Sequence, residues 1–272
     1  MNAAEIRQAL KGWREKFRRT AWIPVTESAD GGSDSQQGNS WFGGRPRVTE
    51  GDWPSCTECS KPMTFFVQLD LSELPAEYDL PVKSGLLQLF YCDSDDGMCE
   101  TWQPFSGTQM ARIVSLEAEP VSIPDGVSLL PLKAILGWEE EEDFPSTAEQ
   151  DVLGLEIDYD LGNQKADIRC PEFDVHLTGL GFNVEAEDPE QGEIDIAEAV
   201  TEARAGDKLG GWPHWVQGVE YPLCPTCGSP MELVLQIDSE DNLDYMFGDV
   251  GCAHLTQCRE HPEQLGFGWA CC

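Results

Sequence analysis

The sequence carries one cysteine-rich segment twice, and this repetition constrains the fold more than any other feature. Residues 53–70 read WPSCTECSKPMTFFVQLD and residues 221–238 read YPLCPTCGSPMELVLQID. The two copies stand in constant register, 168 residues apart (224 − 56 and 238 − 70). The match extends from GGRP at 43–46 to GGWP at 210–213 and from GLLQLFYC at 85–92 to GCAHLTQC at 251–258. We therefore predict an internal pseudo-repeat.

Each copy has the residue spacing of a structural zinc site. A C-x-x-C pair precedes one strand, and a further cysteine ends a second strand. If the two strands pair antiparallel, all three thiols lie at the same end of the pair, one strand spacing of ~4.8 Å apart. Four ligands at Zn–S distances of ~2.3 Å then close a tetrahedral site that leaves no position for water. In the first copy the predicted ligands are Cys56, Cys59, Cys92 and Cys99, the last of which follows the loop 93–98.

The second copy predicts three ligands by alignment and a fourth by spacing. Alignment gives Cys224, Cys227 and Cys258. His261 follows Cys258 at the C-x-x-H spacing that is common in zinc sites, and we favour it as the fourth ligand. Cys271 and Cys272 remain open as alternatives, because the strand 265–270 could return past the site. We thus expect two structural zinc ions, one in each copy.

Other cysteines and histidines near these motifs do not fit a metal site. Cys252 and His254 precede Cys258 on the same strand by six and four residues, which places them too far away at ~3.3 Å per residue. Cys170 and Cys252 are expected to be buried as small hydrophobic residues. A redox role for the C-x-x-C pairs would need a helix after each motif, whereas both motifs lead through Pro-Met into a strand.

The hydrophobic pattern within each copy has the period of a β-strand. One face is predicted to carry Met63, Phe65, Val67 and Leu69, and the other Thr64, Phe66, Gln68 and Asp70. Gln68 and Asp70 recur as Gln236 and Asp238, and we interpret these polar residues as partners of backbone or turn groups. The predicted fold class is α+β, mostly β. We expect a compact antiparallel-sheet protein with an internal pseudo-repeat, each half stapled by a structural zinc site.

The chain is expected to form five consecutive segments. Apolar residues at helical spacing predict an N-terminal amphipathic helix with a basic outer face, which docks on the acidic body of the protein; they are Ile6, Leu10, Trp13 and Phe17. The segments are the basic helix at 1–24, a flexible polar loop at 25–40, the first repeat with zinc site one at 41–138, an acidic connecting segment at 139–204 and the second repeat with zinc site two at 205–272. We expect the repeats to pack as one globular unit. Within the acidic segment, the run Glu139–Asp143 is interpreted as a solvated helix start or loop.

The strong negative charge is the second constraint on the chain. It has 17 basic and 50 acidic residues and a net charge of −33, although residues 1–20 are basic. Such a surface repels nucleic-acid phosphates and anionic membranes and attracts basic proteins, or it serves only to keep the protein soluble. The N-terminus has no apolar signal core, and no apolar run is long enough to span a bilayer, so we expect a cytoplasmic protein.

Several motifs together resemble the YwqG-like family of bacterial proteins of unknown function. They are Phe42-Gly43-Gly44 with Pro46, Trp53-Pro54, Gln68 to Leu74, Gly85 to Tyr91, Lys208 to Pro213 with Trp215 and Gln217, Gln236 to Asp238, and Gly248 to Gly251. The resemblance implies one compact, mostly β protein with an internal pseudo-repeat and supplies no activity. The cysteine pattern is also similar to the C-terminal part of the programmed-cell-death-2 family, whose members are dedicated chaperones of a basic ribosomal protein. This chain lacks that family's separate N-terminal zinc finger.

The sequence favours a non-enzymatic zinc-binding protein over an enzyme. We expect it to bind a basic protein, either a client or a toxin, as a dedicated chaperone or an immunity-type inhibitor. The alternatives are a zinc-dependent hydrolase and an acidic nucleic-acid mimic, while direct nucleic-acid binding and membrane binding are not expected. We identify no catalytic residue, because the sequence has no serine elbow, P-loop or dinucleotide fingerprint. Four protein ligands at both metals would argue against zinc catalysis, which needs an open coordination position.

Overall fold

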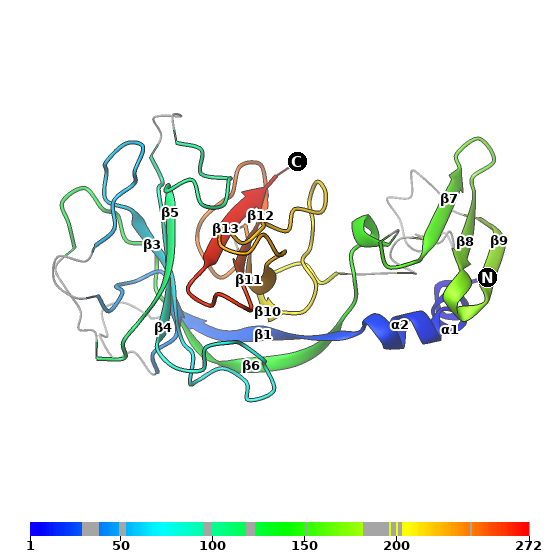
Figure 1. Cartoon of the computed structure of the whole chain (residues 1–272), viewed down its shortest axis with the longest axis horizontal. Coiled ribbons are helices and arrows are strands. Elements are labelled where there is room, and N and C mark those ends of the chain that lie inside the picture. Colours follow the sequence, from blue (N-terminus) through cyan, green and yellow to red (C-terminus); the bar gives the residue numbers. More distant parts are fainter. Residues whose placement is uncertain are drawn as a thin grey trace. The chain divides into compact units, whose positions relative to one another are not determined.

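The computed structural model of the chain divides into two compact units, which we describe separately (Figure 1). The N-terminal unit comprises residues 1–20, 142–204 and 211–219, and the sheet unit comprises residues 21–141, 205–210 and 220–272. The structure describes residues 1–28, 38–48, 53–94, 99–117, 123–150, 152–181, 196, 200, 203–239 and 241–271. Within these ranges, no helix combines the length and the apolar character needed to cross a membrane.

The N-terminal unit is built from two short helices and a three-stranded antiparallel sheet. Its elements are α1 (Ala3–Ala9), α2 (Lys11–Phe17), two 3-10 turns, η1 (Thr147–Glu149) and η2 (Pro171–Phe173), and the strands β7 (Glu156–Asp160), β8 (Lys165–Cys170) and β9 (Val175–Gly181) in the order β7-β8-β9. Helix α1 begins after Asn2 because the Asn2 side chain accepts from the Glu5 amide and the Glu5 carboxylate accepts from the Asn2 amide. The apolar side of the helices packs on the sheet in one buried cluster, which includes Ile6, Leu10, Trp13, Ile168 and Leu180.

The helical segment differs from the single helix expected over residues 1–24. It bends at Leu10, which ends α1 and begins α2, and it stops at Phe17. Strand β1 (Arg19–Ser28) follows at once, because β-branched residues at 20, 23, 25 and 26 favour an extended chain. The expected flexible loop 25–40 is therefore wrong for residues 25–28, which belong to β1, while residues 29–37 lie outside the described part of the chain.

The sheet unit contains a ten-stranded sheet. Besides β1, its strands are β2 (Trp41–Phe42), β3 (Thr64–Asp70), β4 (Leu86–Tyr91), β5 (Gln109–Val114), β6 (Lys133–Asp143), β10 (Lys208–Gly210), β11 (Glu232–Asp238), β12 (Cys252–Gln257) and β13 (Leu265–Ala270). The order is β13-β12-β11-β10-β1-β6-β2-β3-β4-β5. The edge strands approach each other, since the Gln109 side chain on β5 donates to the Phe267 carbonyl on β13 at 2.9 Å. The chain thus forms the mostly β, antiparallel architecture that the sequence predicts.

The strands β2 to β5 and β10 to β13 flank the central strands β1 and β6 in mirror order. Their side chains meet in one large core, in which Phe66 and Tyr91 of the first set pack near Phe247 and Phe267 of the second. Both sets use similar pairings. On β3, Gln68 pairs with a residue of β2, and on β11, Gln236 pairs with a residue of β10.

A β-bulge corrects the expected division of faces in β3. The register shifts between Phe65 and Val67, and an equivalent shift occurs between Leu233 and Leu235 on β11. One inserted residue reverses the alternation, so Phe65 packs around the first cysteine group whereas Val67 lies in the large core with Phe66. The prediction that Phe65 and Val67 share a face is therefore wrong. All residues of β3 are buried, so neither face is solvated.

The acidic run Glu139–Asp143 is neither a helix start nor a loop, because it forms the end of β6. Pairing with neighbouring strands overrides the low β propensity of glutamate. The run is also not uniformly solvated. Glu139 and Glu140 are exposed, but Asp143 is fully buried and accepts hydrogen bonds from the amides of Phe144, Arg204 and Trp212. Residues 211–219, expected in the second repeat, belong to the N-terminal unit.

Candidate metal centres

The first C-x-x-C pair lies at the tip of a tight hairpin that leads into β3. The Cys56 amide donates to the Lys61 carbonyl at 2.9 Å, and the Met63 amide donates to the Pro54 carbonyl at 2.9 Å. Ser60 turns the chain with a φ of 60°, in the left-handed region. This local geometry aims both thiols of the pair toward the end of the sheet.

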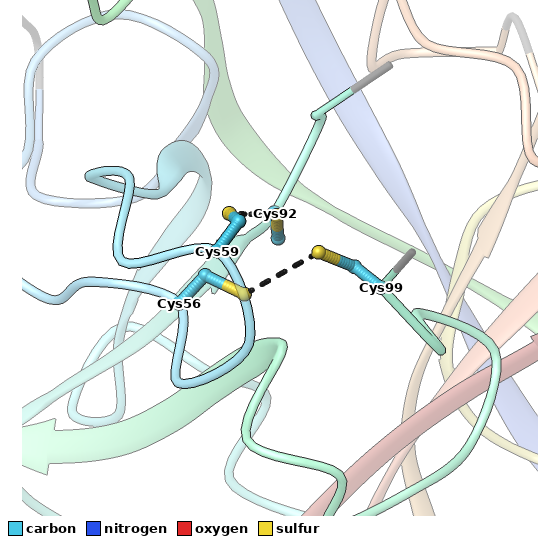
Figure 2. Close-up of side chains that lie close together, drawn as sticks. All are labelled: Cys56, Cys59, Cys92 and Cys99. Atoms are coloured by element: carbon cyan, nitrogen blue, oxygen red, sulfur yellow. Dashed lines mark hydrogen bonds between the residues drawn. The ribbon is translucent and has the colours of Figure 1, made fainter. Parts of the chain in front are cut away.

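The four cysteines predicted for the first site come together (Figure 2). Because β3 and β4 pair antiparallel, with Thr64 opposite Tyr91, Cys92 emerges beside the hairpin. The Cys59 and Cys92 sulfurs lie 3.6 Å apart, and the Cys56 and Cys99 sulfurs lie 3.7 Å apart. Sulfurs bound at ~2.3 Å to one tetrahedral zinc would be ~3.8 Å apart. The group is therefore dimensioned for a single metal ion.

The segment before β5 holds this arrangement from the other side, and sequence reasoning did not single it out. The Cys92 amide donates to the Thr108 carbonyl at 2.8 Å, and the Thr57 amide donates to the Gly107 carbonyl at 3.0 Å. The hairpin tip and the end of β4 are thus fixed to the same two residues. The only sequence signal was their place a short distance after Cys99, which is not diagnostic.

The second C-x-x-C pair has the same local hydrogen bonds. The Cys224 amide donates to the Ser229 carbonyl at 2.9 Å, and the Met231 amide donates to the Pro222 carbonyl at 2.9 Å. Gly228 supplies the left-handed residue with a φ of 75°. The hairpin leads into β11 as the first hairpin leads into β3.

The second predicted group also comes together, with His261 as its fourth member. The sulfurs of Cys227 and Cys258 are 3.7 Å apart, and the His261 Nδ1 atom lies 4.0 Å from the Cys224 sulfur and 3.8 Å from the Cys258 sulfur. A turn after β12 returns the histidine to the site, since the Gln264 amide donates to the His261 carbonyl. The alternative Cys271 is not a member of this group, and Cys272 lies outside the described residues.

Burial and hydrogen bonding prepare the thiols differently. Burial raises the pKa of Cys92 and raises that of Cys99 to about 11. A hydrogen bond from the Lys61 backbone lowers the pKa of Cys59 to about 7. At Cys224 burial is the largest effect and raises the pKa, but amides of the turn and neighbouring thiols outweigh it and bring the value to about 7. A bound cation would supply the charge that buried thiolates otherwise lack.

The remaining polar and sulfur residues have structural surroundings. The buried Gln68 side chain donates to the Asn39 carbonyl and accepts from the Arg47 amide, which agrees with the role expected from the sequence. Cys170 and Cys252 are buried, as predicted. Neither Cys252 nor its neighbour His254 joins a metal-ligating group among the described residues.

The fold and the two groups define a mostly β protein with two cysteine-rich clusters, each able to hold a metal ion. The chain belongs to the family described as a domain of unknown function, DUF1963, whose match covers residues 40–265. A segment of 34 residues is 50% identical to the "Uncharacterized protein YpfL" of Salmonella typhimurium. That segment is 12% of this chain and 8% of the relative, so the similarity covers only a small part of either protein.

Proposed function

We propose that both cysteine-rich groups hold zinc and that the two ions are structural. Sets of four cysteines, or of three cysteines and one histidine, are typical of closed tetrahedral zinc sites, and thiolates select soft or borderline metals over magnesium or calcium. Each group offers four ligand atoms within 4.8 Å of one another, so no coordination position is left for water or substrate. This argument supports a stabilising role for the metals over a zinc-dependent hydrolase.

The two halves are further proposed to be copies of one pseudo-repeat. Support comes from contacts that recur at the sequence offset. An isolated β-bridge joins Ser55 and Pro62, and another joins Leu223 and Pro230, which lies 168 residues further on at both positions (223 − 55 and 230 − 62). The bulges in β3 and β11 stand in the same relation. A duplicated unit explains why the chain needs two metals of similar geometry.

The function proposed for this scaffold is non-enzymatic binding of a basic protein, as a dedicated chaperone or an immunity-type inhibitor. The observation that carries the proposal is the net charge of −33 together with exposed carboxylates on ordered strands. Glu139 and Glu140 are exposed on β6, and Glu156, Asp158 and Asp160 are exposed on β7. Fixed rows of like charge accelerate encounter with an oppositely charged partner and set its orientation. The cysteine pattern shared with the programmed-cell-death-2 chaperones adds to the argument.

Affinity capture with the full chain tests this proposal. Bait protein is incubated with the native lysate, washed at low and then high salt, and the eluate is identified by mass spectrometry. We expect one stoichiometric basic protein that leaves at high salt, because charge-driven association is screened. Baits with Glu139→Gln/Glu140→Gln or Glu156→Gln/Asp158→Asn/Asp160→Asn should retain less of it.

The matched control removes exposed carboxylates that belong to neither row, with Glu77→Gln/Glu117→Gln. This bait should capture as much as the unmodified chain. Equal capture by all baits, or no enriched basic protein, would overturn the proposal. A captured DNA-binding protein that free DNA displaces would instead favour the nucleic-acid mimic.

A further inference from the structure

A pocket with cationic walls lies on the helices of the N-terminal unit. Its volume is about 390 Å³, and its charged lining consists of Arg7, Lys11, Arg14 and Arg18 with Glu15 and Glu142. The lining therefore carries more positive than negative charge, although the whole chain has a net charge of −33. A local reversal of sign in so acidic a protein needs a physical explanation.

The sequence spacing explains how the cations come to line one side of the helices. Residues 7, 11, 14 and 18 follow each other at steps of four, three and four, which keeps them on one helical face. Each stands one position after an apolar residue of the stripe 6, 10, 13 and 17, which packs toward the core of the unit. The burial of the apolar stripe thus presents the basic stripe beside it to the pocket.

Arg14 is held in a fixed orientation within the pocket. Its guanidinium carbon lies 3.6 Å from the ring centroid of Phe144, and its Nη1 atom donates to the Val200 carbonyl at 2.9 Å. Stacking on an aromatic face leaves the edges of the guanidinium for in-plane hydrogen bonds. Arg14 and Arg7 are half-buried, whereas Lys11 and Arg18 are exposed. The two half-buried arginines therefore provide the less solvated part of the positive lining.

The two carboxylates of the lining are weak competitors for these cations. Glu15 lies 3.6 Å from Lys11, and Glu142 lies 2.7 Å from Arg18. All four side chains are more than half exposed, and ion pairs of this kind contribute little to stability because water and salt screen them. An incoming anion can therefore exchange with either carboxylate at low cost.

We propose that this pocket binds a small ligand that carries an oxyanion group, a phosphate or a carboxylate. Planar guanidinium groups match both anions with paired hydrogen bonds. The pocket volume lies within the range of small-molecule sites in proteins, ~300–1,000 Å³, so the ligand is a metabolite-sized molecule. This site is independent of the cysteine-rich groups and of the exposed carboxylates proposed to bind a basic protein.

An NMR titration of the full chain tests the proposal with two probes, inorganic phosphate and succinate. The arginine Nε–Hε signals are followed at constant ionic strength, with chloride as the reference anion. We expect saturable shifts of the Arg7 and Arg14 signals, and the stronger probe identifies the oxyanion class. Arg14→Gln should weaken binding about tenfold, because a charge-assisted pair is lost. Glu15→Gln and Glu142→Gln should strengthen it about twofold, because each removes a competing charge.

The control is Arg45→Gln, which changes the net charge equally at an exposed residue of the sheet unit. It should leave both affinities unchanged. If Arg14→Gln does not fold, the exposed Lys11→Gln replaces it and should weaken binding severalfold. Linear shifts without saturation for both probes, or equal affinities of the Arg14 and Arg45 variants, would overturn the proposal.

Discussion

The sulfur of Cys59 lies 3.6 Å from the sulfur of Cys92, although 33 residues separate them in the chain. One is at a hairpin tip and the other follows the last residue of β4, so their approach depends on the antiparallel pairing of β3 with β4. Cys227 and Cys258 stand in the same relation, with sulfurs 3.7 Å apart and 31 residues between them. A metal at each site would therefore tie a hairpin to the end of a neighbouring strand.

Loss of one ligand should release one metal. We expect Cys59→Ser and Cys227→Ser each to lower the metal content from two ions to one per chain. The melting temperature should fall as well, because metal binding to the folded state contributes directly to folding free energy. Inductively coupled plasma mass spectrometry and thermal unfolding measure the two effects. Cys271→Ser is the control, and loss of metal from that variant would contradict the assignment of His261.

The two hairpins should differ in a predictable way in their tolerance of side chains. Gly228 and Ser60 occupy equivalent turn positions with positive φ, and nothing lies within 4 Å of a Cβ placed on Gly228. Gly228→Ser should therefore cost about 1 kcal/mol from backbone strain and keep both metals. Gly43→Ala should cost more, because its Cβ would collide with the Pro131 carbonyl oxygen. Urea unfolding measures both, and equal costs would contradict the close approach at Gly43.

Asp143 should be the one carboxylate of the EEEED run on which folding depends. It is fully buried and accepts the Trp212 amide at 2.7 Å and the Arg204 amide at 2.8 Å. Asp143→Ala should lower the free energy of unfolding by about 3 kcal/mol or more, since buried backbone donors lose their acceptor. The exposed neighbour Glu140→Ala should change it by less than about 0.5 kcal/mol. Similar values for the two variants would show that the acidic run acts only through its charge.

The buried Asp207 should make stability depend on pH. Burial and the neighbouring Asp241 carboxylate raise its pKa from 3.8 to about 7. Between these values the folded chain holds a proton that the unfolded chain has released, so the contribution of this group to stability falls as the pH rises. Relative to the unmodified chain, Asp207→Asn should therefore gain stability with rising pH, by roughly 1–4 kcal/mol across the window.

Urea unfolding of both proteins between about pH 5 and about pH 8 measures the difference, over the range in which the pKa shift acts. Asp241→Asn serves as the second variant. It should lower the pKa of Asp207 and shift the pH dependence to lower values, because it removes the neighbouring carboxylate. A difference that stays constant with pH would contradict the raised pKa.

The candidate ligands could be predicted because their geometry is mostly local. The C-x-x-C spacing fixes two thiols at a hairpin tip, and simple strand pairing places Cys92 and Cys258 beside them. The C-x-x-H spacing likewise brings His261 back through one turn. The repeated segment provided an independent check on each assignment within the sequence itself.

Features that depend on distant neighbours could not be predicted from local patterns. The bulge between Phe65 and Val67 depends on the register with β4, so strict alternation assigned one residue to the wrong face. The strand at Glu139–Asp143 depends on neighbouring strands in the sheet, which no property of four glutamates specifies. The end of the helix at Phe17 depends on the strand that follows.

Metal analysis of the natively purified chain tests the central claim most directly. The protein is prepared without chelator or added metal, and its content is measured by mass spectrometry alongside zinc X-ray absorption. We predict two zinc ions per chain and an average shell of four sulfur and nitrogen ligands without water. Little or no bound zinc in a chain that remains folded, or an oxygen ligand at either site, would contradict the account.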